Sequence, residues 1–302
     1  MEKIKFSIVI LNYNTGKEAI ECIRSIERTD LSKVEVSYII VDNCSTDNSC
    51  ELLESEFKNN DNINILKLEK NYGFSKGNNI GYQYARKRYN PEFIGVINSD
   101  ILFNQHDFFN KFLDIYNKNN FYILGPDIYA PKMKIHQNPY KLRTPTYEEI
   151  ECELLKFQKK LEKENKLIDN SLINKAKLFI NKIRINNTNN YKNEQHNIVL
   201  YGAALFFSKK FIHIQDDCFY PETFLYGEEI LLSILSKEKG YENIYTPDLQ
   251  VIHLAGVSTN KTHGKNSTKN GNIFRNKQFI LSRKKIMERM KEIKGINEWK
   301  SQ

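Results

Sequence analysis

The sequence predicts an α/β protein whose core is a doubly wound, mostly parallel sheet flanked by helices. Two observations predict it. Short apolar segments alternate with segments of helical periodicity over residues 6–100, and a polar turn follows each apolar segment. Ligands of such sheets bind at the carboxyl ends of the strands, so the four polar turns predict one shared binding site.

The four predicted strands are short, apolar and rich in β-branched or aromatic residues, as strands buried on both faces are. They are Phe6–Leu11, Val34–Val41, Ile63–Leu68 and Phe93–Ile97. A helix is expected after each of the first three strands. The first helix should begin with a capping box formed by Thr15 and Glu18, and it should bury an apolar stripe from Ala19 to Ile26.

The second half of the chain has a less regular pattern. Residues 148–196 are strongly charged, with leucine and isoleucine at helical spacing, and they predict a helical insertion between core strands. Ile198–Phe207 and Val251–Leu254 have the composition of strands, whereas Thr223–Gly240 is typical of a loop followed by a helix. No internal repeat is evident.

The positive charge of the chain is concentrated near its C-terminal end. The formal net charge is +8, and residues 259–302 contain 12 lysines and arginines against 3 glutamates. Residues 273–293 predict a basic amphipathic helix, whose apolar face comprises Phe279, Ile286, Met290 and Ile293. This helix could lie on an anionic membrane or pack on the rest of the protein, and the sequence leaves both open. No basic and aromatic motif predicts a nucleic-acid partner.

Composition excludes several classes of protein. The longest apolar segments, Phe6–Leu11 and Ala203–Phe207, are far shorter than the roughly 18 residues that a membrane-spanning helix requires. Met1–Leu11 resembles a signal peptide only superficially, because polar residues follow its short apolar part at once. The five cysteines form no CxxC pair and fit reduced thiols. We therefore expect a cytoplasmic protein without a zinc site.

Two of the polar turns contain side chains that suit a nucleotide. Asp42 directly follows the second strand, where a carboxylate can accept hydrogen bonds from a base or ribose, or can cap the next helix. The segment Asn71–Asn79 combines two glycines with side-chain amides before a helix. That pattern favours close approach of a phosphate, although a plain turn and helix cap have the same composition. The first turn lacks a glycine pair, which weighs against a dinucleotide fold.

Three further sites carry groups that suit metal binding or proton transfer. Asp100 ends the turn after the fourth strand, where a carboxylate can bind a divalent cation that also bridges two phosphates. Glu228 and Glu229 are adjacent at a predicted helix start, and such a pair can raise one pKa, which suits a general base. His253 follows an apolar strand and can bind a metal or a phosphate. A turn, a partner of the helix dipole and a structural histidine are the respective alternatives.

Taken together, these segments resemble glycosyltransferase family 2, whose members adopt the GT-A fold with a Rossmann-like sheet. The resemblance covers residues 6–258 and is carried by the ordered series VILNYN, VDNCSTD, NYGFSKGNN, INSD, YGAALFFSK, FLYGEE and VIHLAGVS. Its subgroup is similar to the rhamnosyltransferase-like enzymes of surface polysaccharide assembly. The resemblance implies a glycosyltransferase domain at 1–258, with a nucleotide-sugar-binding half at 1–103, the insertion at 148–196 and an acceptor and catalytic half at 197–258. A basic helical extension would follow at 259–302.

The resemblance also implies roles for individual residues. Those expected to bind the donor and its nucleotide are Asn12, Tyr13, Asn14, Asp42, Asn71, Gly73, Phe74, Gly77, Asn78, Asn98 and Ser99. The Asn98–Asp100 turn resembles the Asp-x-Asp motif of the family with its first Asp replaced, and Asp100 and His253 would ligate the metal. Gly202 and Ala203 match a segment beside the acceptor.

The acidic pair of the family, whose second member usually is the base, matches Glu228 and Glu229. The second member is usually Asp, and the further acid that is common two positions on is Leu231 here. Which glutamate is the base therefore stays open at this point.

The function implied by the resemblance is an inverting transfer of a hexose or deoxyhexose from a dTDP- or UDP-sugar to a hydroxyl of a glycan or lipid-linked glycan. A carboxylate would remove the acceptor proton, and Mn²⁺ or Mg²⁺ would stabilise the leaving diphosphate. If the C-terminal helix binds lipid, the enzyme would work at the inner face of the cell membrane. A non-catalytic nucleotide- or glycan-binding relative and a nucleotidyltransferase are the alternatives.

Overall fold

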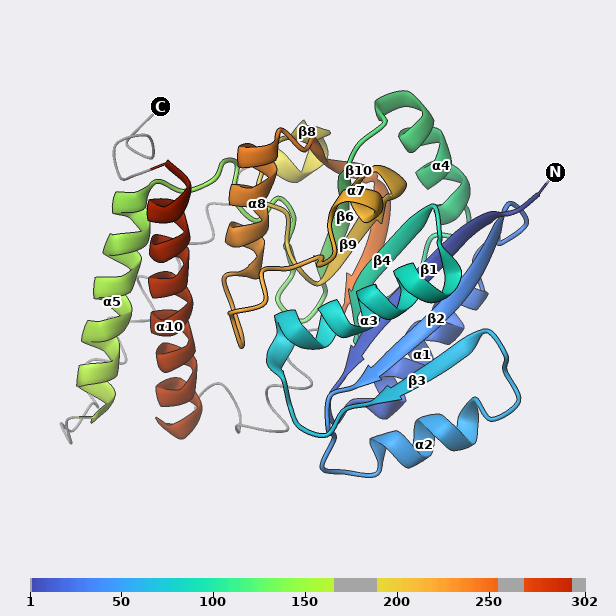
Figure 1. Ribbon diagram of the computed structural model, residues 1–302, viewed down its shortest axis with the longest axis horizontal. Helices are drawn as coiled ribbons and strands as arrows, with labels where there is room; N and C mark the ends of the chain where they lie inside the picture. The colour runs from blue at the N-terminus through green and yellow to red at the C-terminus, as the bar shows by residue number, and fades with distance from the viewer. Residues whose placement is uncertain (1, 166–188, 255–268, 295–302) are drawn as a thin grey trace.

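The computed structural model describes residues 2–165, 189–254 and 269–294, and these residues form a ten-stranded mixed sheet with helices on both faces (Figure 1). Six strands run in one direction: β1 (Ile4–Asn12), β2 (Val34–Asp42), β3 (Ile63–Lys67), β4 (Phe93–Asn98), β6 (Ile123–Ala130) and β10 (Asn243–His253). Four shorter strands run the opposite way: β5 (Ile101–Leu102), β7 (Ile135–His136), β8 (Gln195–His196) and β9 (Ala204–Ser208).

The strand order confirms the predicted fold class. It is β3-β2-β1-β4-β9-β6-β10-β5, with β7 paired to β6 and β8 to β10. Asn12 is in register with Asp42 across the β1–β2 ladder, and Leu11 is in register with Asn98 across the β1–β4 ladder. The parallel register therefore places the polar ends of β1, β2 and β4 side by side, as the sequence predicted.

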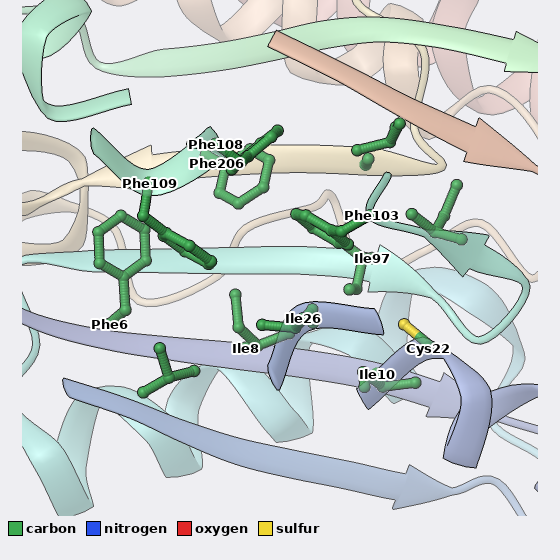
Figure 2. Close-up of a cluster of buried hydrophobic side chains, with 14 of the residues drawn as sticks. Phe6, Ile8, Ile10, Cys22, Ile26, Ile97, Phe103, Phe108, Phe109 and Phe206 are labelled. Atoms are coloured by element: carbon green, nitrogen blue, oxygen red, sulfur yellow. The ribbon is translucent and has the colours of Figure 1, made fainter. Parts of the chain in front are cut away.

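Apolar helix faces cover the sheet on both sides. One face is covered by α1 (Gly16–Glu27), α2 (Ser49–Glu56) and α4 (Phe108–Asn119), and the other by α3 (Gly73–Tyr89) and α7 (Lys209–Ile214). Figure 2 shows Phe6, Ile8 and Ile10 of β1 packed with Cys22 and Ile26 of α1, Phe108 and Phe109 of α4, and Phe206 of β9. This core fixes the ends of the strands, where the polar turns begin.

The capping box predicted for α1 is wrong. The Thr15 hydroxyl makes no cap hydrogen bond with α1. It donates instead to Asn12 Oδ1 at 2.9 Å and lies 2.8 Å from the Ser99 hydroxyl. Thr15 therefore connects two strand ends of the polar edge, which is a tertiary role that local sequence spacing does not reveal.

The second half differs from the sequence prediction in several bounds. The helical insertion is seen as α5 (Tyr147–Asn165), residues 166–188 lie outside the described residues, and a short 3₁₀ helix, η1 (Asn189–Lys192), follows. The strand predicted at Ile198–Phe207 begins only at Ala204, and β10 begins eight residues before the predicted Val251. The helix predicted after Thr223 is α8 (Glu228–Lys239).

The predicted C-terminal helix is α10 (Lys269–Lys294), which lies alongside α5, with α8 between this pair and the sheet (Figure 1). Ile286 and Met290 are fully buried in a cluster with residues of α5 and α8, and Ile293 packs against that cluster. The packed alternative is thus the one that the structure shows for this apolar face. A membrane contact through other surfaces of α10 stays a prediction.

Two further expectations can be compared with the structure. All five cysteines are free thiols, as expected. Within the described ranges, no helix is both long enough and apolar enough to cross a bilayer.

Candidate active site

The carboxylate of Asp42 is held at the end of β2 by three hydrogen bonds. Asn12 Nδ2 and the Ser45 hydroxyl donate to its Oδ1 at 2.7 and 2.6 Å, and the Ser45 backbone N–H donates to its Oδ2 at 3.1 Å. The side chain is 4% exposed. Asp42 therefore orders the turn that follows β2 and presents a carboxylate of fixed orientation at the polar edge.

A second set of hydrogen bonds ties the turn after β1 to the turn after β2. Asn14 has a left-handed backbone (φ 58°), and its Oδ1 accepts from the backbone N–H of Thr46 at 2.7 Å and of Asp47 at 3.3 Å. Tyr13, between Asn12 and Asn14 in the chain, is half-buried. The predicted nucleotide-binding residues of these two turns thus belong to one ordered surface.

The turn before α3 is fixed by amide side chains. Asn43 Nδ2 donates to Asn71 Oδ1, its Oδ1 accepts from the Tyr72 backbone, and Asn71 Oδ1 also accepts from the Gly73 backbone, at distances of 2.9 to 3.1 Å. Gly73 has φ +80°, and a Cβ there would lie 2.5 Å from the carbonyl oxygen of Phe224. Only glycine fits this contact.

The same turn meets the loop that precedes α8. The Phe74 backbone N–H donates to the Phe224 carbonyl at 2.7 Å, and the hydroxyls of Ser75 and Thr223 are 2.8 Å apart. Residues 223 and 224 are more than 140 positions away in sequence, so these bonds join the two halves of the site. The N-terminus of α3, which favours a phosphate, therefore borders the loop that leads to Glu228 and Glu229.

Gly77 and Asn78 have different places within α3. A Cβ at Gly77 would lie 2.6 Å from Leu11 Cδ1, so this glycine allows α3 to pack closely on β1. Asn78 is 1% exposed, and its Nδ2 donates to the Phe74 carbonyl at 3.0 Å. Its Oδ1 is buried without a hydrogen-bond partner among the described residues, which leaves an acceptor near the phosphate-favouring end of the helix.

Asp100 and His253 meet at the edge where β5 pairs with β10. Ile101 is in register with His253, and the Leu254 backbone N–H donates to the Asp100 carbonyl at 3.0 Å. His253 Nε2 lies 3.1 Å from Asp100 Oδ1. Both side chains are buried, at 7% exposure for Asp100 and 6% for His253. The structure thus brings together the two residues that the sequence analysis assigned to a metal.

This pair fits a divalent cation. His253 Nδ1 lies 2.6 Å from Gln137 Oε1 and can donate to it, and the Nε2 lone pair would then be available to a cation held beside Asp100. A carboxylate and an imidazole suit Mn²⁺, and such ions complete their coordination with water and substrate phosphates. In the part of the chain that the structure describes, no third Asp, Glu, His or Cys joins the pair to make a metal cluster.

The two glutamates at the start of α8 have different surroundings. Glu228 is 6% exposed, and its Oε2 has no hydrogen-bond partner in the described part of the molecule. Burial, reinforced by the neighbouring Glu229, raises the pKa of Glu228 well above its usual range, which favours the protonated form of this side chain. Burial also raises the pKa of Glu229, but backbone N–H groups, including that of Gly202, and Arg283 oppose the rise. Glu229 is partly exposed at the surface of the site.

The Tyr201–Ala203 segment joins the Asp100 side of the site to Glu229. A Cβ at Gly202 would lie 3.3 Å from Glu229 Oε1, and the Ala203 carbonyl accepts from the Asn98 backbone at 2.9 Å. The Tyr201 hydroxyl lies 3.4 Å from Gln137 Nε2. Gly202 and Ala203, predicted to lie near the acceptor, thus sit between the Asn98–Asp100 turn and the acidic pair.

One connected series of contacts results. It runs through Asp42, Asn12, Thr15, Ser99, Asp100, His253, Gln137, Tyr201, Gly202 and Glu229. The sequence analysis assigned no role to Gln137 or to Tyr201, although Tyr201 begins the segment YGAALFFSK. Tyr201 directly precedes the predicted Gly202, whereas Gln137 lies in a segment where no element was predicted.

The comparison with protein families matches this arrangement. The model described as "Glycosyl transferase family 2" matches residues 7–211, which is more than half of the chain. The chain belongs to glycosyl transferase family 2. The family match includes the turns at Asp42, Asn71 and Asp100, whereas Glu228, Glu229 and His253 lie beyond its end, so their assignment depends on the geometry.

Curated relatives match this family 2 chain over limited segments. The poly(ribitol-phosphate) β-N-acetylglucosaminyltransferase TarS of *Staphylococcus aureus* is 32% identical over 109 residues, which cover 36% of this chain and 17% of TarS. The glycosyltransferase GlyG of *Streptococcus pneumoniae* is 27% identical over 119 residues, covering 39% and 38%. The chain thus spans well under two thirds of the length of these relatives.

Solved structures share the fold of this family 2 chain over nearly its whole length. A structure of residues 1–349 of *S. aureus* TarS aligns with a TM-score of 0.52 and 15% identity, covering 96% of this chain and 73% of the other. The mannosyltransferase PcManGT of *Pyrobaculum calidifontis*, solved with GDP-Man and Mn²⁺, aligns with a TM-score of 0.53 and 10% identity, covering 98% and 77%. At these identities the likeness concerns the fold alone.

Proposed function

We propose that this protein is an inverting glycosyltransferase that moves a sugar from a nucleoside-diphosphate sugar to a hydroxyl of a glycan or lipid-linked glycan. The observation that carries the proposal is the connected series of contacts from Asp42 through Asp100 and His253 to Glu229. It supports a nucleotide at one end, a diphosphate in the middle and an acceptor at the other end. Family membership supports the same class of reaction.

The donor nucleotide would occupy the edge formed by Tyr13, Asp42 and Asn71. Asp42 supplies carboxylate oxygens of fixed orientation for a base or ribose. The N-terminus of α3 lies beside this edge and favours the phosphates. Asp100 and His253 would hold Mn²⁺ or Mg²⁺, which when bound stabilises the negative charge of the departing diphosphate.

Glu229 is the better candidate for the base. Glu228 is buried, its Oε2 has no hydrogen-bond partner among the described residues, and burial raises its pKa well above the usual range, which disfavours the carboxylate form that a base requires. Glu229 is partly exposed beside Gly202, and the amides at the start of α8 favour its ionised form. Glu229 would take the proton of the acceptor hydroxyl while that oxygen bonds to the anomeric carbon and the bond from this carbon to the diphosphate oxygen breaks.

The relatives suggest which donors to test first. TarS is named an N-acetylglucosaminyltransferase and its solved structures include a complex with UDP, while PcManGT was solved with GDP-Man. UDP-N-acetylglucosamine, GDP-mannose and a dTDP-deoxyhexose therefore cover three bases and three kinds of sugar. Transfer of a hexose or deoxyhexose in surface polysaccharide synthesis is the broader context that we propose.

Donor turnover by the purified protein tests the function. We expect release of nucleoside diphosphate from one of these donors with Mn²⁺, and its loss with EDTA. Asp100→Ala and Glu229→Gln should each lower the rate by at least ~10²-fold, the usual effect of removing such groups. Glu228→Gln is the matched control for the base and should lose less than Glu229→Gln.

Two outcomes would contradict the proposal. Binding of a nucleoside diphosphate, seen as a thermal shift, without turnover of any donor would favour a non-catalytic binding relative. Near-normal turnover by both Asp100→Ala and Glu229→Gln would remove the assigned roles even if the protein is an enzyme.

A further inference from the structure

Two helices from distant segments of the chain meet where α8 begins. α5 and α10 lie along each other, and α10 also contacts α8 (Figure 1). Gly227, the residue before α8, has φ +90°, and a Cβ there would lie 3.1 Å from Ile286 Cδ1 and Ser282 Cβ of α10. Tyr226 also has a left-handed backbone, with φ 67°. The turn that precedes Glu228 and Glu229 therefore packs directly against α10.

Arg283 of α10 is a buried charged residue between α10 and α5. It is 4% exposed, and its Nε and Nη2 each lie 2.9 Å from Glu153 Oε2 of α5. Its guanidinium also lies over the rings of Phe157 and Phe279, at 5.6 and 5.1 Å from their centroids. A buried arginine that is paired and stacked in this way has one orientation.

Stacked aromatic rings connect Arg283 to the turn before α8. The Phe279 ring stacks on Phe157 of α5 at 4.4 Å and on Tyr226 at 4.2 Å. Tyr226 immediately precedes Gly227, so Arg283, its aromatic partners and the start of α8 form one packed unit. The positive charge of Arg283 also lowers the pKa values of Glu228 and Glu229, against the stronger effect of burial.

We propose that Arg283, paired with Glu153, is a positioning residue that holds the first turn of α8 so that Glu229, the proposed base, faces Gly202. The α5–α10 pair is then part of the catalytic unit. This inference rests on the proposed function, because it assigns Arg283 a role in the reaction through Glu229. Besides Arg283, the titratable groups that interact electrostatically with Glu229 are Glu228 and the hydroxyls of Tyr140, Tyr201 and Tyr226. None of these groups carries a positive charge.

The test compares Arg283→Met with Arg289→Met. Arg289 lies on the same helix and pairs with Glu238 near the other end of α8, so it controls for loss of an α10–α8 ion pair. We expect Arg283→Met to lower kcat by about 10-fold or more and to move the acidic limb of the rate profile upward by about one pH unit. The KM for the donor should stay within about twofold, and Arg283→Lys should restore part of the rate.

A second measurement is independent of turnover. The side-chain carboxyl carbons of labelled glutamate are titrated by NMR, with Glu229 assigned from Glu229→Gln. Arg283→Met should raise the titration midpoint of Glu229, and Arg289→Met should leave it unchanged. Because Arg283→Met leaves the Glu153 carboxylate with one partner fewer, Arg283→Met with Glu153→Gln is measured beside it as a variant without the stranded charge.

The outcomes separate this inference from the proposed function. An unchanged Glu229 midpoint in Arg283→Met and in the double variant overturns the inference, whether or not the wild type turns over donor. Equal loss of rate in Arg283→Met and Arg289→Met with the same pH profile also overturns it, because both then act only on stability. Absence of turnover in the wild type contradicts the proposed function alone.

Discussion

At the scale of single residues, the orientation of His253 depends on Gln137. The side-chain oxygen of Gln137, Oε1, accepts from His253 Nδ1 at 2.6 Å, and the Gln137 backbone N–H donates to the Ile128 carbonyl at 2.8 Å. A histidine that donates one ring N–H in this way presents the other nitrogen to a metal in a fixed direction. Gln137 would thus orient a ligand of the proposed metal site without touching the metal itself.

Replacing Gln137 tests that part. Gln137→Leu should weaken Mn²⁺ binding in the presence of a nucleoside diphosphate by about 10- to 100-fold, as loss of such supporting hydrogen bonds does. Binding is measured by electron paramagnetic resonance of free Mn²⁺. Gln83→Leu on α3, which removes a hydrogen bond to Asp217, is the control and should bind as the wild type does. Equal affinity in both variants would show that Gln137 does not orient the ligand.

The sequence predicted the residues whose neighbours in the chain form motifs. Asp42 ends β2 and Asp100 follows β4, whose polar ends flank that of β1, and Glu229 lies in the first turn of α8 beside Gly202. Gln137 and Arg283 could not be found in this way, because their roles arise from contacts with His253 and Glu153, more than 110 positions away in the chain. Such contacts exist only once the fold is formed.

At the scale of elements, two prolines explain why β6 and most of β10 were missed. β6 contains Pro126 and β10 contains Pro247, and proline normally marks a turn or an edge strand. In β10 the proline lies inside the register shift between Thr246 and Gln250, where the ladder with β6 is interrupted. The irregularity therefore accommodates a residue that local rules exclude, and the strands stay in the middle of the sheet.

The buried glutamates at the start of α8 make the stability of the fold depend on pH. Burial raises the pKa of Glu228 from its ordinary value of 4.5, so the native state holds a proton that the unfolded chain releases. The contribution of Glu228 to stability is complete below pH 4.5 and is lost as the pH rises toward its raised native pKa. Glu229 acts in the same direction.

Glu228→Gln should remove much of this dependence. The Tm of the variant relative to the wild type should increase between pH 5 and pH 9, because glutamine fills the same space without an ionisable proton. Differential scanning calorimetry across this range measures the change. Glu288→Gln, at an exposed position of α10 paired with Lys285, is the control and should follow the wild type. A constant difference between Glu228→Gln and the wild type would mean that Glu228 is ionised in the native state.

At the scale of the whole molecule, α5 and α10 share a buried core with α8. Ile150 of α5, Ile230 and Ile234 of α8, and Ile286 and Met290 of α10 are fully buried in one cluster. The sequence analysis placed α5 in an insertion and α10 in a separate extension, because charge and spacing distinguish both from the sheet-forming segments. A shared core favours instead one cooperative unit, in which α10 folds with the site.

Truncation of one buried side chain tests this view of the molecule. Ile286→Ala should destabilise the protein by about 2–5 kcal/mol, the usual cost of such a cavity, and should leave a single unfolding transition. Leu281→Ala on the same helix removes a side chain that is 56% exposed and should change the stability by less than about 0.5 kcal/mol. Calorimetry and circular dichroism should give the same Tm for each variant. Two transitions, of which Ile286→Ala lowers only one, would instead mean that α10 unfolds as a separate extension, and the site would then have to keep its structure and its nucleotide affinity without it.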